Sequence, residues 1–107
     1  MSKGITAMNG PLRRVVTITN PQGLHIRPAA AFAELAQRYA EAKVTVSREG
    51  QTVDGKFWPD LLLLAAEQGT NLTLEVDGPE AAEVLDALTE QLAVVFDDES
   101  PAVPPKG

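Results

Sequence analysis

Cysteine is absent from this chain of 107 residues, and histidine occurs once, as His25. Without cysteine the chain can form no disulfide and no zinc or iron–sulfur site built on thiolates. A single histidine also argues against a metal centre held by imidazoles. Aromatic residues are few, with 3 Phe, 1 Tyr and 1 Trp, so the core must be mainly aliphatic. We therefore expect neither a metal nor a cofactor.

Positive charge is scarce, and long apolar runs are missing. The chain has 9 Lys and Arg against 15 Asp and Glu, which gives a formal net charge of -6. Nucleic-acid binding needs a basic surface, so we expect no nucleic-acid partner. No apolar run reaches the ~18 residues of a membrane helix, and the N-terminal residues lack the apolar segment of a secretory signal. We expect a monomeric cytoplasmic protein without membrane insertion.

Hydrophobic periodicity predicts one α+β domain. Alternating and β-branched residues predict strands over residues 12–19, 43–48, 51–54 and 71–76. Helical spacing of apolar residues predicts helices over residues 26–40 and 81–92. The run of residues 61–66 could be a buried strand or a short helix. Its leucines and alanines without β-branching favour the helix, and Pro59 fits the helix start. The order β-α-β-β-α-β-α with short connections implies an antiparallel or mixed sheet with the helices on one face. We expect this domain to cover residues 12–95, between a flexible leader (residues 1–11) and a disordered acidic, proline-rich tail (residues 96–107).

Several residues are expected to end elements or to close the core. Gly69 should stop the second helix, and the segment from Asp77 to Glu80 offers caps for the third. The bulky pair Phe57 and Trp58 stands directly before the second helix. We expect this pair to plug one end of the core, and we expect the run from Leu61 to Leu64 beside it to be partly exposed.

The stretch from Gly23 to Ala30 holds the chemistry of the chain. His25 lies where a strand and turn give way to a helix, with Arg27 two residues later and Pro28 in the first helical turn. A neutral imidazole is a nucleophile near neutral pH. A helix N-terminus and a guanidinium both stabilise a phosphoryl group. This junction therefore predicts a histidine that accepts phosphate, while Gly23 lets the chain turn sharply and Pro28 preorganises the helix.

Residue chemistry alone leaves a second interpretation open. A lone histidine at a helix start is more often a surface or capping residue. An arginine two residues later is common, and glycine before and proline after indicate a helix start without indicating a function.

The segment of residues 20–30, Asn-Pro-Gln-Gly-Leu-His-Ile-Arg-Pro-Ala-Ala, resembles the active-site signature of HPr, the histidine-containing phosphocarrier family of the bacterial phosphotransferase system. The resemblance extends over residues 12–95. It implies an open-faced β-sandwich of four antiparallel strands with three helices on one side. It also implies a phosphocarrier with a covalent phosphohistidine, serving sugar uptake or a regulatory relay, rather than an enzyme that turns over a free substrate.

The resemblance assigns roles to individual residues. The phosphoryl group would come from phospho-enzyme I, reside on Nδ1 of His25 beside Arg27, and pass to an EIIA-type domain. The residues expected around the phosphoryl group at the helix N-terminus are Gly23, Ile26, Pro28 and Ala29. The residues expected to dock partners are Leu24, Ile26, Phe57, Trp58 and Leu61.

Some positions depart from the family pattern. Phe57 stands where the family has its regulatory serine, so regulation by phosphorylation there should be absent. Glu34, Gln37 and Asp60 stand where the family often has lysines on its docking face. A second functional hypothesis is therefore an interaction or regulatory module that keeps the fold and binds partners without obligatory phosphotransfer.

Overall fold

The computed structural model describes residues 10–95, and these contain four strands and three helices. Their bounds are β1 (Leu12–Thr17), α1 (Ile26–Gln37), β2 (Lys43–Arg48), β3 (Gln51–Asp54), α2 (Trp58–Leu62), β4 (Asn71–Asp77) and α3 (Ala81–Ala93). The predicted tail (residues 96–107) and all but the last two residues of the predicted leader (residues 1–11) lie outside the described residues.

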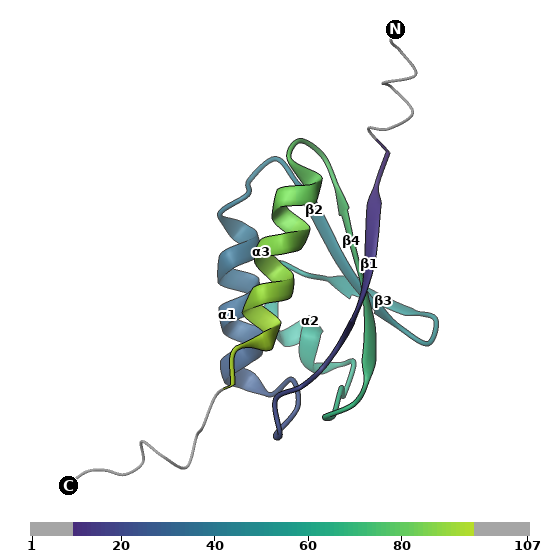
Figure 1. Ribbon diagram of the computed structural model, residues 1–107, viewed down its shortest axis with the longest axis vertical. Coiled ribbons are helices and arrows are strands. Elements are labelled where there is room, and N and C mark those ends of the chain that lie inside the picture. Colours follow the sequence, from purple (N-terminus) through teal and green to yellow (C-terminus); the bar gives the residue numbers. More distant parts are fainter. Residues whose placement is uncertain (1–9, 96–107) are drawn as a thin grey trace, which may run out of the picture.

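The strands form one sheet in the order β1-β4-β2-β3, and every neighbouring pair is antiparallel. All three helices cover the same face of this sheet (Figure 1). The alternation in β4 explains the two faces, because Leu72, Leu74 and Val76 are buried towards the helices while Thr73 and Glu75 between them are not. The predicted open-faced α+β architecture is confirmed.

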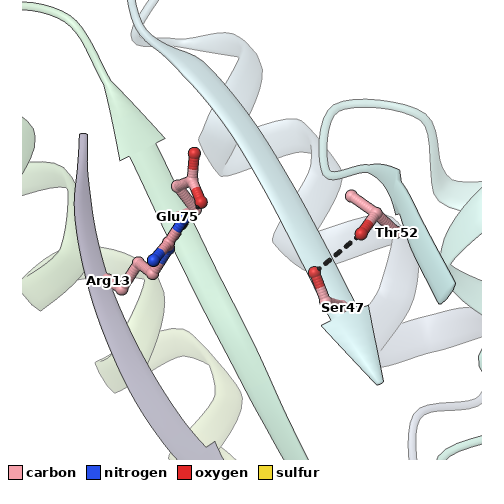
Figure 2. A network of polar contacts seen from close by, with 4 residues as sticks. All are labelled: Arg13, Ser47, Thr52 and Glu75. Atoms are coloured by element: carbon pink, nitrogen blue, oxygen red, sulfur yellow. Dashed lines mark hydrogen bonds and ion pairs between the residues drawn. The ribbon is translucent and has the colours of Figure 1, made fainter. Parts of the chain in front are cut away.

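The other face of the sheet carries polar side chains from neighbouring strands. Arg13 Nε donates to Glu75 Oε1 at 2.8 Å, and the hydroxyls of Ser47 and Thr52 lie 3.0 Å apart (Figure 2). Both pairs are direct partners in the antiparallel register. This face can remain open because its side chains bond to one another and to water.

The core lies between the sheet and the helices. The helices contribute two apolar stripes, one on α1 that is rich in alanine and one on α3 that is rich in leucine. Small side chains on α1 let its backbone approach the sheet closely. The largest side chains with almost no exposed surface are Phe32, Leu61, Leu64, Leu72, Leu74 and Leu88.

Two predicted elements end earlier than expected. β1 stops at Thr17 rather than at residue 19, because Ile18 exchanges hydrogen bonds with the turn before β4 at Gly69 and Thr70 (both 2.8 Å). α1 stops at Gln37 rather than at residue 40. Its following turn is closed by the Lys56 ammonium, which donates to the carbonyl of Tyr39 at 3.0 Å.

The second helix begins one residue before its predicted start at Pro59, and its predicted stop signal, Gly69, was wrong. α2 begins at Trp58 and ends at Leu62, and the chain turns away at Ala65, whose φ is 49°. The Arg48 guanidinium donates to the carbonyl of Ala65 at 2.9 Å and so engages the end of the helix. A tertiary contact therefore ends α2 before Gly69 is reached.

The predicted side-chain cap of α3 is also wrong. Its N-cap is Glu80, at a φ of 62°, and no side chain makes a capping hydrogen bond there.

Phe57 and Trp58 do not plug the core, since 53% and 40% of their surface is exposed. Both lie at the start of α2, where the short helix turns them towards solvent.

Replacing Ala65 by glycine should stabilise the protein. Alanine in the left-handed region costs about 1 kcal/mol relative to glycine, so we expect Ala65→Gly to raise the free energy of unfolding by about that amount in a urea titration. The matched control is Ala87→Gly in the interior of α3, where glycine should lower the free energy of unfolding by a similar amount. Destabilisation by both variants would contradict the account of this turn.

Candidate functional site

The segment that precedes His25 is held against the segment that follows α2. The Leu24 N–H donates to the Ala66 carbonyl at 2.8 Å. The Gln68 side chain donates to the Thr19 carbonyl at 3.2 Å. Together with the two hydrogen bonds of Ile18, these contacts join residues 18–24 to residues 66–70. The backbone that leads into His25 is therefore fixed from a distant part of the sequence.

Gly23 makes this close approach possible. It lies at a φ of 77°, and its N–H closes a turn by donating to the Asn20 carbonyl at 2.8 Å. A Cβ added at Gly23 would lie 2.5 Å from the Ala66 carbonyl oxygen. Glycine is therefore required here both for its conformation and for the absence of a side chain.

His25 occupies the N-cap position of α1 in an extended conformation, with φ -90° and ψ -169°. Its carbonyl accepts the first helical hydrogen bond from Ala29 N–H at 2.9 Å, but its imidazole makes no capping hydrogen bond. The capping interpretation of this histidine is therefore wrong. The imidazole is half-buried, and its Nε2 atom is withdrawn from solvent.

The first turn of α1 presents fewer N–H donors than we expected. Pro28 has none, and that of Ala29 is engaged by the His25 carbonyl. Both residues are buried. Gly23 is likewise buried, and its N–H serves the turn. The remaining N–H groups of the first turn belong to Ile26 and Arg27, whose residues are exposed.

The residues predicted to dock partners divide into two groups. Ile26, Phe57 and Trp58 have 56%, 53% and 40% of their surface exposed. Leu24 and Leu61 are 6% and 1% exposed, so both belong to the core, and their predicted contact with a partner is wrong. The apolar run of α2 could not show this, because a helix of one and a half turns gives too little periodicity to assign each leucine to a face.

The run from Leu61 to Leu64 was expected to be partly exposed, whereas the contact of Arg48 was not predicted from the sequence. Leu63 is 61% exposed and extends the apolar surface beyond Trp58. Arg48 donates to the carbonyls of Leu64 and Ala65 at 2.8 and 2.9 Å, and so fixes the backbone next to Ala66. No local pattern in the sequence indicates the contact of Arg48 with this backbone.

Among residues 10–95 no three His, Cys, Asp or Glu side chains come together in a way that could hold a metal ion. No helix within this range has the length and apolarity needed to cross a bilayer.

Comparison with known proteins identifies relatives of this domain. The family model described as the PTS HPr component phosphorylation site matches residues 12–93. Phosphocarrier protein HPr of Cupriavidus necator is 41% identical over 85 residues, which cover 79% of this chain and 94% of that protein. Phosphocarrier protein HPr of Pseudomonas aeruginosa is 43% identical over 84 residues, which cover 78% of this chain and 92% of that protein.

A solved structure that is similar to this chain is also that of an HPr protein. The crystal structure of phosphocarrier protein HPr from Bacillus anthracis superposes with a TM-score of 0.73 and 31% sequence identity. The superposition covers 78% of this chain and 98% of that chain.

Adding a methyl group at Gly23 should weaken the fold much more than adding one at another glycine of similar conformation. Gly50 has a φ of 88°, but no atom lies within 4 Å of the position of its added Cβ. We expect Gly50→Ala to lower the free energy of unfolding by about 1 kcal/mol through backbone strain alone. Gly23→Ala should lower it by about 2–4 kcal/mol, because the clash with Ala66 adds to the strain. Equal losses in denaturant titrations would show that the contact with Ala66 is not tight.

Proposed function

Since the chain belongs to the HPr family of phosphocarriers of the bacterial phosphotransferase system, we propose that His25 receives a phosphoryl group from phospho-enzyme I and passes it to an EIIA-type domain. The observation that carries this proposal is the placement of a half-buried imidazole at the N-cap of α1 without a capping role. The backbone there is held in place by the contacts between residues 18–24 and residues 66–70.

The nitrogen that accepts the phosphoryl group is Nδ1. Nε2 of His25 is withdrawn from solvent, so a donor protein meets the ring from the other side. Nδ1 can attack only in the tautomer that carries its proton on Nε2. The burial of Nε2 and the use of Nδ1 are therefore two consequences of one ring orientation.

Transfer forms a bond between phosphorus and Nδ1 of His25 while the bond from phosphorus to the donor breaks. The electron pair of the broken bond stays with the donor. The second transfer repeats these events with His25 as the donor and the acceptor domain as the nucleophile. No oxidation or reduction takes place, so the proposed function needs no cofactor.

The charge of the phosphoryl group is stabilised at the start of α1. Its oxygens lie at the positive end of the helix dipole, close to the N–H of Ile26 and to the guanidinium of Arg27. Pro28 and Ala29 shape the turn from within the core rather than contact phosphate, because both are buried. Gly23 acts in the same indirect way through the close contact with Ala66.

Partners dock on the exposed apolar residues Ile26, Phe57 and Trp58. Aromatic side chains of this kind often dominate the energy of protein interfaces. Phe57 has no hydroxyl, so the position cannot be regulated by serine phosphorylation. We place the relay in the cytoplasm, with residues 12–95 as its functional unit. The acceptor belongs to a sugar-uptake branch or to a regulatory branch of the system.

Replacing His25 should abolish phosphorylation. Incubation of the native protein with phosphoenolpyruvate and enzyme I of its own organism should add one acid-labile phosphoryl group, detected by intact-protein mass spectrometry. Phosphorus and nitrogen NMR should place it on Nδ1. The His25→Ala variant should remain folded and unlabelled.

The possible outcomes separate the two functional hypotheses. Labelling of His25→Ala would show that the site is assigned to the wrong residue. A native protein that binds enzyme I but is never labelled would favour the interaction module.

Replacing Arg27 should slow transfer without unfolding the protein. Arg27→Ala removes one guanidinium from the charge that forms at His25, and we expect a loss of about 10- to 100-fold in the rate of single-turnover transfer. Arg38→Ala is the matched control, because Arg38 is also exposed but lies at the other end of α1. Equal rates for the two variants in a rapid-quench assay would contradict the role of Arg27.

A further inference from the structure

We infer that Arg48 is a positioning residue for phosphoryl transfer at His25, an inference that rests on the proposed phosphocarrier function. Arg48 is the last residue of β2 and lies outside the segment that carries the histidine. It acts through the backbone that follows α2 rather than on the phosphoryl group, because that backbone holds the residue directly before His25.

The alternation of β2 directs the Arg48 side chain towards the helices. Val44 and Val46 are buried in the core, and Arg48 follows them at the same spacing of two residues. The Nε atom of Arg48 is withdrawn from solvent and has no hydrogen-bond partner among residues 10–95. Incomplete solvation of a cation costs free energy. The place of the guanidinium is therefore explained by the contacts of its terminal nitrogen.

This terminal nitrogen holds the backbone on both sides of Ala65. Arg48 Nη1 donates to the carbonyls of Leu64 and Ala65 at 2.8 and 2.9 Å. The two carbonyls belong to the peptide groups that flank the Cα atom of Ala65, so one cation restrains both backbone dihedrals of that residue. Ala65 has a φ of 49°, a left-handed conformation that is strained for any residue with a Cβ. Arg48 therefore opposes the relaxation of this strain.

The conformation of Ala65 sets the direction of the next carbonyl, which holds the site. The Ala66 carbonyl accepts the N–H of Leu24 at 2.8 Å, and Leu24 directly precedes His25. Relaxation of Ala65 would rotate this carbonyl away from Leu24. A Cβ added at Gly23 would lie 2.5 Å from the same carbonyl oxygen, so the segment before His25 follows any displacement of Ala66. Arg48 thus fixes the start of α1 from the end of β2.

Phosphoryl transfer depends on this placement more steeply than folding does. The buried leucines and valines between the sheet and the helices do not depend on the conformation of Ala65. A displacement of about 1 Å at a reacting atom, in contrast, can lower a rate about 100-fold. The exposed pair Phe57 and Trp58 lies at the start of α2, away from the carbonyls that Arg48 holds. Loss of Arg48 should therefore lower kcat more than it raises KM.

Replacing Arg48 by methionine tests the inference, because methionine keeps an apolar stem but has no donor. We expect Arg48→Met to lower kcat for transfer from phospho-enzyme I of the same organism about tenfold, with KM within about twofold. Arg48→Lys should retain most of the native kcat, since one ammonium nitrogen can also donate to both carbonyls. Circular dichroism would establish that each variant is folded.

The matched control is Arg14→Met. Arg14 donates to the Thr89 hydroxyl at 3.3 Å and pairs with Asp86 at 2.8 Å, so it joins β1 to α3 and makes no contact with the segment after α2. This variant also loses a partly buried guanidinium and its contacts. We expect it to leave kcat within about twofold, because these contacts do not hold the backbone before His25.

Amide hydrogen exchange separates positioning from a general loss of stability. In Arg48→Met the N–H of Leu24 should exchange about tenfold faster relative to that of Leu74, which lies in an interior strand and reports global unfolding. In Arg14→Met the two amides should be accelerated equally. Exchange needs no phosphorylation, so it tests the link from Arg48 to Leu24 independently of the proposed function.

Three results would overturn the inference. They are an unchanged kcat for Arg48→Met, a loss of kcat no larger than that of Arg14→Met, and exchange of Leu24 that follows that of Leu74. A native protein that enzyme I never labels would instead overturn the proposed function, and the role of Arg48 in transfer would fail with it. The exchange rates of Leu24 would distinguish these two failures.

Discussion

The hydrogen bond from the Leu24 N–H to the Ala66 carbonyl is the contact on which the site depends. It joins the segment before His25 to the segment after α2, and it forms only because Gly23 leaves no Cβ between the two backbones. Neighbouring bonds at Ile18 extend the junction towards β4. The start of α1 therefore has a fixed position relative to the sheet. A phosphate-accepting histidine needs this rigidity, because the orientation of its ring decides which nitrogen a partner reaches.

The same junction links stability to recognition. Arg48 and Lys56 engage carbonyl groups where α2 and α1 have ended, and such carbonyls would otherwise lack partners. This arrangement lets α2 be only five residues long. A helix so short buries Leu61 but cannot also bury Phe57 and Trp58. The exposure of an aromatic pair beside the site thus follows from how α2 is anchored.

The sequence predicted much of the fold because its signals are local. Alternation placed β2 and β3 at their observed bounds, and the turn before His25 together with Pro28 marked the start of α1. The wrong predictions lie where a contact between residues distant in the sequence determines the local structure. Ala65 adopts a left-handed conformation, and its carbonyl is engaged by a strand residue 17 positions earlier. Leu24 and Leu61 looked suitable for docking because they stand near the site, but packing across the core buries both. Local periodicity cannot report either contact.

A phosphocarrier must associate with a donor and an acceptor and then leave each of them. In the proposed cycle each transfer changes the charge of the carrier at His25, because the phosphoryl group adds about -1.5 to -2 there. The exposed apolar residues Ile26, Phe57 and Trp58 do not change between the two states. They would therefore set the register of docking, while the charge at His25 distinguishes the loaded carrier from the empty one.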